Sequence, residues 1–280
     1  MKLENVIADL HVHGFTSPET GFGDFLLKPF GPGKRTITSF IEYSRRKVGA
    51  KNTVVGVVNF DNNTYEIIAN SRKRLSISQI YDDHRKVFVG VNRVGKWFLL
   101  IRGQEIHTDI GHVLVLVGDS NIKYRKFEDV HKAAKDMGAL LVADHVLGTF
   151  GLGAENLRKY KEFFSGVEAA NSIFPELTEK TERLLSEPDF AGLARYYNSD
   201  SHSLRTIFSS YTLFDVLDIS NPCSLKDGLR KSIKGQAGKN RIGEKYIHAV
   251  SVAYNLGRFI IGDKLRFVPG LLRRQETEIE

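Results

Sequence analysis

Short apolar segments recur along this chain and alternate with stretches of helical periodicity. Predicted strands lie at 6–8, 54–58, 87–91, 97–101, 113–117, 140–143, 166–170 and 194–198. Predicted helices lie at about 39–48, 127–137, 154–164, 176–185 and 224–235. Buried strands that alternate with helices favour an α/β fold with a mostly parallel sheet. The strand number approaches that of a barrel, in which functional residues gather where strands end and loops begin.

Composition places the chain among ordinary globular proteins. Its 280 residues, 41% of them hydrophobic, suffice for a large core in one domain covering 1–280. No run of about 18 apolar residues is present, so no membrane span is expected. The start of the chain lacks a signal-peptide pattern, and a single cysteine, Cys223, fits a reducing compartment. We therefore expect a cytoplasmic protein.

The charge balance is basic, with 40 Lys and Arg against 33 Asp and Glu and a net charge of +7. A positive balance is compatible with anionic partners. The basic residues are spread over most of the chain, with one local concentration at 230–245. None of these stretches resembles an RNA-recognition motif, a zinc finger or a basic zipper. Charge alone therefore leaves a nucleic-acid partner open and leaves the oligomeric state unknown.

The first predicted strand leads directly into three polar side chains, Asp9, His11 and His13. Alternate side chains of an extended chain share a face, so we expect all three to point the same way. Neutral imidazoles are suitable ligands for zinc, iron and manganese. The segment therefore predicts part of a metal site at the end of a buried strand.

Four further segments place a metal-capable side chain beside a predicted strand. They contribute Glu105 and His107, then His112, then Asp144 and His145, and finally Asp200 and His202. Carboxylates and imidazoles at strand ends converge on one mouth of a barrel, and this mixture of oxygen and nitrogen ligands suits a cluster of divalent metals.

These motifs, in this order, resemble the polymerase and histidinol phosphatase (PHP) superfamily. They are Asp-Leu-His-Val-His at 9–13, Gly-Gln-Glu at 103–105, Gly-His at 111–112, Asp-His at 144–145 and Ser-Asp-Ser-His at 199–202. The resemblance implies a distorted (βα)7-type barrel with a metal site at the C-terminal ends of the strands. It also implies hydrolysis of phosphoric esters. Residues 206–280 would then close the barrel and pack against it.

The resemblance implies a role for each matching residue. His11, His13 and Asp200 would bind a first metal, Glu105 would bridge it to a second, and His112 and His145 would complete the second. His202 matches the ligand of a third metal, and Asp9 would be an acceptor that orients a histidine ring.

Two departures bear on the third metal. Many members end their second strand with Thr-Asp-His, whereas this chain has Asn59-Phe60-Asp61 there, and Phe60 cannot bind a metal. The stretch 16–19 also differs from the usual Asp-Gly pair. The candidate replacement ligands are Glu19, Asp24, Asp61 and His107. We therefore expect two divalent ions of zinc, manganese or iron, with the third site incomplete.

The implied reaction is attack of metal-activated water on a phosphoryl group. His202 is the candidate general acid for the leaving oxygen if no third metal binds, because a free imidazole titrates in the right range. Lys34 and Arg35, in the long segment after the first strand, are candidate phosphate contacts, as is Arg205 after the last motif.

The sequence favours a metal-dependent phosphoesterase acting on a small phosphomonoester or nucleotide. A PHP-type nuclease or phosphodiesterase on DNA or RNA is the alternative, supported by the basic balance. A third hypothesis is a metal-binding PHP-like domain without turnover, supported by the lost ligand at Phe60.

Overall fold

The computed structural model describes only part of the chain. The described residues are 1–13, 46, 48–49, 51–59, 63–70, 79–81, 84, 86–93, 95–172, 174–201, 207–231 and 235–236. All of them lie within one compact unit, Met1–Asn240. Apart from residues 46 and 48, which are helical, the predicted helix at 39–48 lies outside the described residues.

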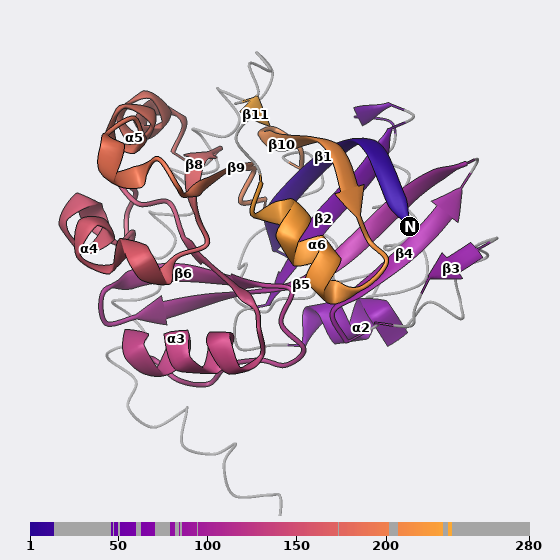
Figure 1. Ribbon diagram of the computed structural model, residues 1–280, viewed down its shortest axis with the longest axis horizontal. Helices are drawn as coiled ribbons and strands as arrows, with labels where there is room; N and C mark the ends of the chain where they lie inside the picture. The colour runs from indigo at the N-terminus through magenta and orange to yellow at the C-terminus, as the bar shows by residue number, and fades with distance from the viewer. Residues whose placement is uncertain are drawn as a thin grey trace, which may run out of the picture. The chain divides into compact units, whose positions relative to one another are not determined.

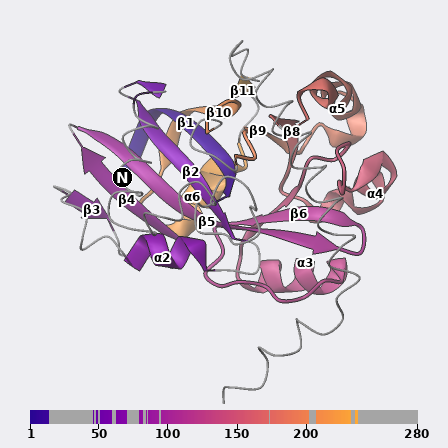
Figure 2. The ribbon, with the colours of Figure 1, turned by 180° about the vertical axis from the view of Figure 1, so that it is seen from behind.

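The described strands form one mixed sheet that is nearly closed into a barrel (Figures 1 and 2). Seven strands follow one another along the sheet, each paired with the next, in the order β1 (Lys2–His13), β2 (Asn52–Asn59), β5 (Lys96–Thr108), β6 (Gly111–Leu116), β7 (Leu140–Ala143), β8 (Gly166–Asn171) and β9 (Ala194–Asn198). An isolated parallel bridge between Val12 and Ser201 joins the two ends of this path.

One strand departs from the expected βα repeat. β6 runs antiparallel to both β5 and β7, and a hairpin rather than a helix connects β5 to β6. β4 (Phe88–Arg93) also forms a hairpin with β5, as the sequence predicts, and β3 (Gln79–Tyr81) pairs with β4. The fold is therefore α/β and barrel-like, and the β5–β6 connection differs from the βα unit of a regular barrel.

The C-terminal part of the unit extends the sheet. β10 (Tyr211–Asp218) lies antiparallel to the first half of β1, and β11 (Gly235–Gln236) pairs with β10. α6 (Pro222–Leu229) follows, and the side chain of Asn221 caps it by accepting a hydrogen bond from the amide of Ser224. The same edge of β1 thus pairs with β10 near the start of β1 and with Ser201 near the end of β1.

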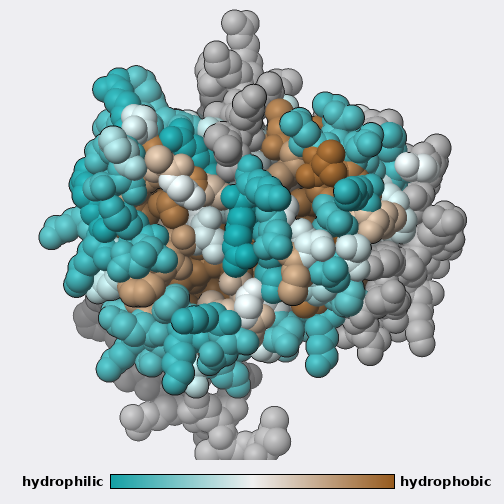
Figure 3. Space-filling view, viewed as in Figure 1, coloured by the Kyte–Doolittle hydropathy of each residue, from teal (hydrophilic) through white to brown (hydrophobic). Residues whose placement is uncertain are grey.

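Helices cover the outside of the sheet (Figure 1). They are α2 (Thr64–Asn70), α3 (Phe127–Asp136), α4 (Gly153–Tyr160) and α5 (Thr178–Leu185), with short 3-10 helices at Lys161–Phe163, Pro175–Leu177 and Pro188–Phe190. The helices α3, α4 and α5 match predicted helices. Figure 3 shows hydrophilic residues over the outer faces of these three helices. No helix among the described residues is long and apolar enough to span a membrane.

The interior of the barrel is apolar. Side chains from successive strands, including Leu10, Leu99, Leu114, Val142 and Tyr196, form one buried cluster. This packed core fills the barrel, and the buried histidines lie at one end of the strands.

Candidate metal centre

The buried polar residues gather where the parallel strands end. His11 and His13 lie at the carboxyl end of β1, Asp144 and His145 directly follow β7, and Asp200 is the second residue after β9. Glu105 lies inside the long strand β5 and Glu168 inside β8. His112 lies at the start of β6, which reaches the same edge because it runs in the opposite direction.

The first group of ligand atoms contains the Nε2 atoms of two histidines on β1, His11 and His13, and the carboxylate oxygens beside them. His11 Nε2 and His13 Nε2 lie 3.0 Å apart. His13 Nε2 is 3.3 Å from Glu105 Oε2 and 3.1 Å from Asp200 Oδ1. His11 Nε2 is 3.8 Å and 3.4 Å from the same two oxygens.

These spacings fit a tetrahedral cation. Four ligands bound at about 2.1 Å in a tetrahedron must lie about 3.4 Å from one another. The five separations between a ring nitrogen and its neighbours in this group, 3.0 to 3.8 Å, bracket that value. His11, His13 and Glu105 offer ligand atoms that all lie within 4.8 Å of one another, and Asp200 adds an oxygen beside both rings.

The second group uses the other oxygen of Glu105. Glu105 Oε1 contacts His112 Nδ1 and lies 3.6 Å from His145 Nε2. Glu105, His112, Asp144 and His145 together offer ligand atoms within 4.8 Å of one another. The carboxylate of Glu105 thus faces one set of imidazoles with each of its oxygens.

Asp144 provides a test of whether a cation fits here. Its side chain is fully buried, and neither carboxylate oxygen forms a hydrogen bond with a described residue. Its oxygens nevertheless lie 3.3 Å from His11 Nδ1 and 3.3 Å from His145 Nε2. A buried carboxylate without hydrogen bonds is costly unless positive charge compensates it. The donor set and this carboxylate both fit a divalent ion.

The electrostatics of the cluster favour positive charge. Burial lowers the pKa of His145, but the Asp144 and Glu105 carboxylates raise it more, to about 10. Burial also opposes the charge of His11, yet Asp200, Asp144 and Glu168 hold the pKa of its ring well above the usual value. Without a cation, the carboxylates therefore favour protonated rings at His11 and His145. A bound cation would compensate the carboxylates instead and displace the protons.

A register shift in β1 changes the direction in which the side chains of its last residues point. The pairing with β2 shifts between Asp9 and Val12, opposite Gly56. A side chain at Gly56 would place its Cβ 2.2 Å from the carbonyl oxygen of Leu10, so only glycine allows this close approach. Such irregularities re-aim side chains. In a regular strand Ile7 and Val12 would face opposite sides of the sheet, yet here both pack in the same buried cluster.

Asp9 does not share the environment of His13, which corrects the expectation of a common face. Among the described residues, its carboxylate accepts hydrogen bonds from the amide and hydroxyl of Ser199 and from the amide of Phe208. Burial raises the pKa of Asp9 to about 6 in spite of these bonds. Its contacts fix the segment after β9 rather than orienting a histidine ring.

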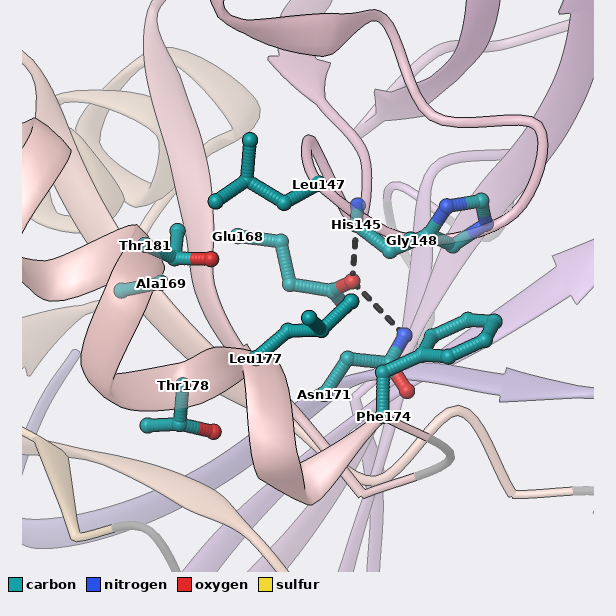
Figure 4. A pocket seen from close by; sticks show the side chains of 10 residues that line it. All are labelled: His145, Leu147, Gly148, Glu168, Ala169, Asn171, Phe174, Leu177, Thr178 and Thr181. Carbon is teal, nitrogen blue, oxygen red and sulfur yellow. Dashed lines mark hydrogen bonds between the residues drawn. The ribbon is translucent and has the colours of Figure 1, made fainter.

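Glu168 is the acidic residue that sequence reasoning missed. Its Oε1 lies 3.1 Å from His11 Nδ1, and its Oε2 accepts a hydrogen bond from the amide of His145 (Figure 4). Asn171 and Asn198 also donate to it. A lone carboxylate within the predicted buried strand 166–170 was the signal available, since such a group requires partners.

The remaining predicted site residues divide into two sets. His107 is exposed, and its Nδ1 lies 3.1 Å from His112 Nε2, so it contacts a candidate ligand from outside the two groups. Outside the described residues lie the predicted general acid His202, the predicted phosphate contacts Lys34, Arg35 and Arg205, and the third-site positions Glu19, Asp24, Phe60 and Asp61.

Comparison with known proteins identifies shared architecture. No family model and no curated protein match the chain. The crystal structure of PsfC from Pseudomonas syringae is 15% identical with a TM-score of 0.58, covering 92% of this chain and 100% of that one. A two-domain protein from Bacteroides vulgatus, described as containing a predicted PHP-like metal-dependent phosphoesterase, is 15% identical with a TM-score of 0.48. That match covers 83% of this chain and 64% of the other. The similarity to PsfC shows that the chain shares its fold.

Proposed function

We propose that the protein binds two divalent cations and hydrolyses a phosphoric ester, with a small phosphomonoester or a nucleotide as substrate. The observation that carries this proposal is the position of Glu105, whose two oxygens face two separate groups of imidazoles. His11, His13 and Asp200 would hold the first cation with Glu105. His112 and His145 would hold the second, with Asp144 beside them.

Divalent cations supply Lewis acidity toward phosphoryl oxygens and lower the pKa of water. The chain supplies the rest, a buried set of donors that would hold both cations. The order of the sequence motifs, which resembles that of PHP proteins, supports phosphoester chemistry at this centre. Lys34, Arg35 and Arg205 are proposed to contact the phosphate, and His202 to donate a proton to the leaving oxygen.

The test uses protein stripped of metal by a chelator and reloaded with zinc, manganese or iron. We expect two tightly held ions per chain and hydrolysis of at least one compound in parallel panels of phosphomonoesters, cyclic nucleotides and single-stranded oligonucleotides. Cleavage of oligonucleotides alone, with salt-sensitive affinity, would favour the nuclease alternative. Two bound ions without turnover on any panel would contradict hydrolysis and support the metal-binding domain.

A further inference from the structure

Glu168 connects four strands of the barrel through one buried carboxylate. Its Oε1 is 3.1 Å from His11 Nδ1 and accepts a hydrogen bond from Asn198 Nδ2 at 3.0 Å. Its Oε2 accepts from the amide of His145 at 3.1 Å and from Asn171 Nδ2 at 2.8 Å. The partners therefore come from β1, β9, the residues after β7, and β8 itself.

The number of donors fixes the chemical state of this carboxylate. Each carboxylate oxygen offers two lone pairs, so Glu168 has four acceptor positions for its four partners. Three of the donors, the amide of His145 and the side-chain amides of Asn171 and Asn198, cannot reverse their direction in these contacts. The carboxylate therefore acts only as an acceptor toward the fourth partner, His11 Nδ1.

An acceptor at Nδ1 determines which nitrogen of His11 is available to a metal. A neutral imidazole carries one proton, and the nitrogen without it is the ligand atom. If the proton stays on Nδ1, the lone pair is on Nε2, the atom that faces His13, Glu105 and Asp200. Asp144 Oδ1 lies 3.3 Å from Nδ1, farther than the 3.1 Å of Glu168 Oε1, so Glu168 is the nearer acceptor.

We propose that Glu168 is a positioning residue that keeps the proton of His11 on Nδ1 and so reserves Nε2 for the first cation. The inference rests on the proposed metal centre and adds a residue to it. Asn171 extends the same arrangement, because its amide also donates to Asp200 Oδ2 at 3.1 Å. Figure 4 shows Asn171 and the amide of His145 directed at the Glu168 carboxylate, with Thr181 of α5 lining the same pocket.

The experiment compares Glu168→Gln with Thr181→Val. Glutamine keeps the shape but places an NH2 group opposite either His11 and Asn198 or His145 and Asn171, whereas the valine substitution alters the pocket without touching those donors. We expect zinc affinity at the first site of the Gln variant to fall by about 10- to 100-fold. The second site should change less, and Thr181→Val should bind two ions as the wild type does.

A second measurement needs no variant. Nitrogen-15 chemical shifts of His11 in the zinc-loaded wild type should show a protonated Nδ1 and a metal-bound Nε2. A wild-type His11 that binds zinc through Nδ1 would overturn the proposal even if the variant does not fold. Unchanged zinc affinity in a folded Gln variant would also overturn it. If the wild type binds two ions but hydrolyses nothing, only the proposed hydrolysis fails, whereas a wild type that binds none ends both.

Discussion

The Nε2 atoms of His11 and His13 lie 3.0 Å apart although both residues belong to one strand with only Val12 between them. The register shift opposite Gly56 accompanies this convergence. Both ring nitrogens also lie within 3.8 Å of the same two carboxylate oxygens, those of Glu105 and Asp200, and the space beside these atoms is the candidate first metal site. The following predictions test whether a cation occupies that space.

Removing one donor of the first group should abolish metal binding and hydrolysis together. In His13→Ala or Asp200→Ala the first cation loses one of four ligands, so its affinity should fall by more than the about 10- to 100-fold typical of groups outside the ligand set. Elemental analysis and phosphoesterase assays would measure both effects. His131→Ala, a ring packed against Phe163 on the outside, is the control. Full activity in either site variant would contradict the assignment.

Glu105→Gln should weaken both sites, because each oxygen of Glu105 faces a different group of imidazoles. Glutamine leaves an amide NH2 toward one group and removes the negative charge from both. We expect less than one tightly bound ion per chain, whereas the exposed control Glu128→Gln should keep two. A Gln variant that still holds both ions would show that Glu105 is not shared.

Asp9→Asn should separate folding from metal binding. The amide NH2 cannot accept hydrogen bonds, so at least one donor among the groups of Ser199 and Phe208 loses its acceptor. We expect the free energy of unfolding to fall by about 1–3 kcal/mol, with both cations retained. Denaturant titration and elemental analysis measure the two quantities, with Asp129→Asn as the exposed control. Loss of a cation at unchanged stability would instead support a ring-orienting role.

Metal affinity should rise with pH. The pKa of His145 in the metal-free protein is about 10, since Asp144 and Glu105 outweigh the effect of burial. At neutral pH a cation must therefore displace a proton, and each displaced proton makes affinity rise by up to about tenfold per pH unit below that pKa. Zinc titrations at several pH values, with proton release measured by calorimetry, would check this. Affinity that does not change with pH would mean that His145 is neutral without metal.

Gly56→Ala should damage the fold and the first metal site together. The added Cβ would lie 2.2 Å from the backbone oxygen of Leu10, next to His11 in the shifted part of β1. We expect a loss of unfolding free energy of more than about 3 kcal/mol and weaker binding of the first cation. Gly192→Ala is the matched control, because nothing lies within 4 Å of its added Cβ. Equal stability of the two variants would show that β1 can shift away.

Much of the architecture follows from local patterns. Apolar runs bounded by turn residues predicted β1, β2 and β4 to β9 but not β3, β10 or β11, and the helix at 127–137 corresponds to α3 (Phe127–Asp136). The direction of β6 could not be predicted, because the apolar pattern of a strand is the same whether the strand is parallel or antiparallel to its neighbour. The hairpin after Thr108 depends on the pairing of β5 with β6. Asp9 was misplaced for a related reason: strict alternation predicts a common face, and alternation cannot anticipate a register shift.

The sequence by itself determined which residue types stand at the strand ends, because apolar runs that finish in imidazoles and carboxylates are visible along the chain. Only the tertiary structure decided which of them meet. The separations within the metal centre depend on strand order and register, which bring His11 to Asp200 and Glu168 across more than half of the chain. Those are long-range properties, set by the packing of the whole barrel, and no local pattern encodes them.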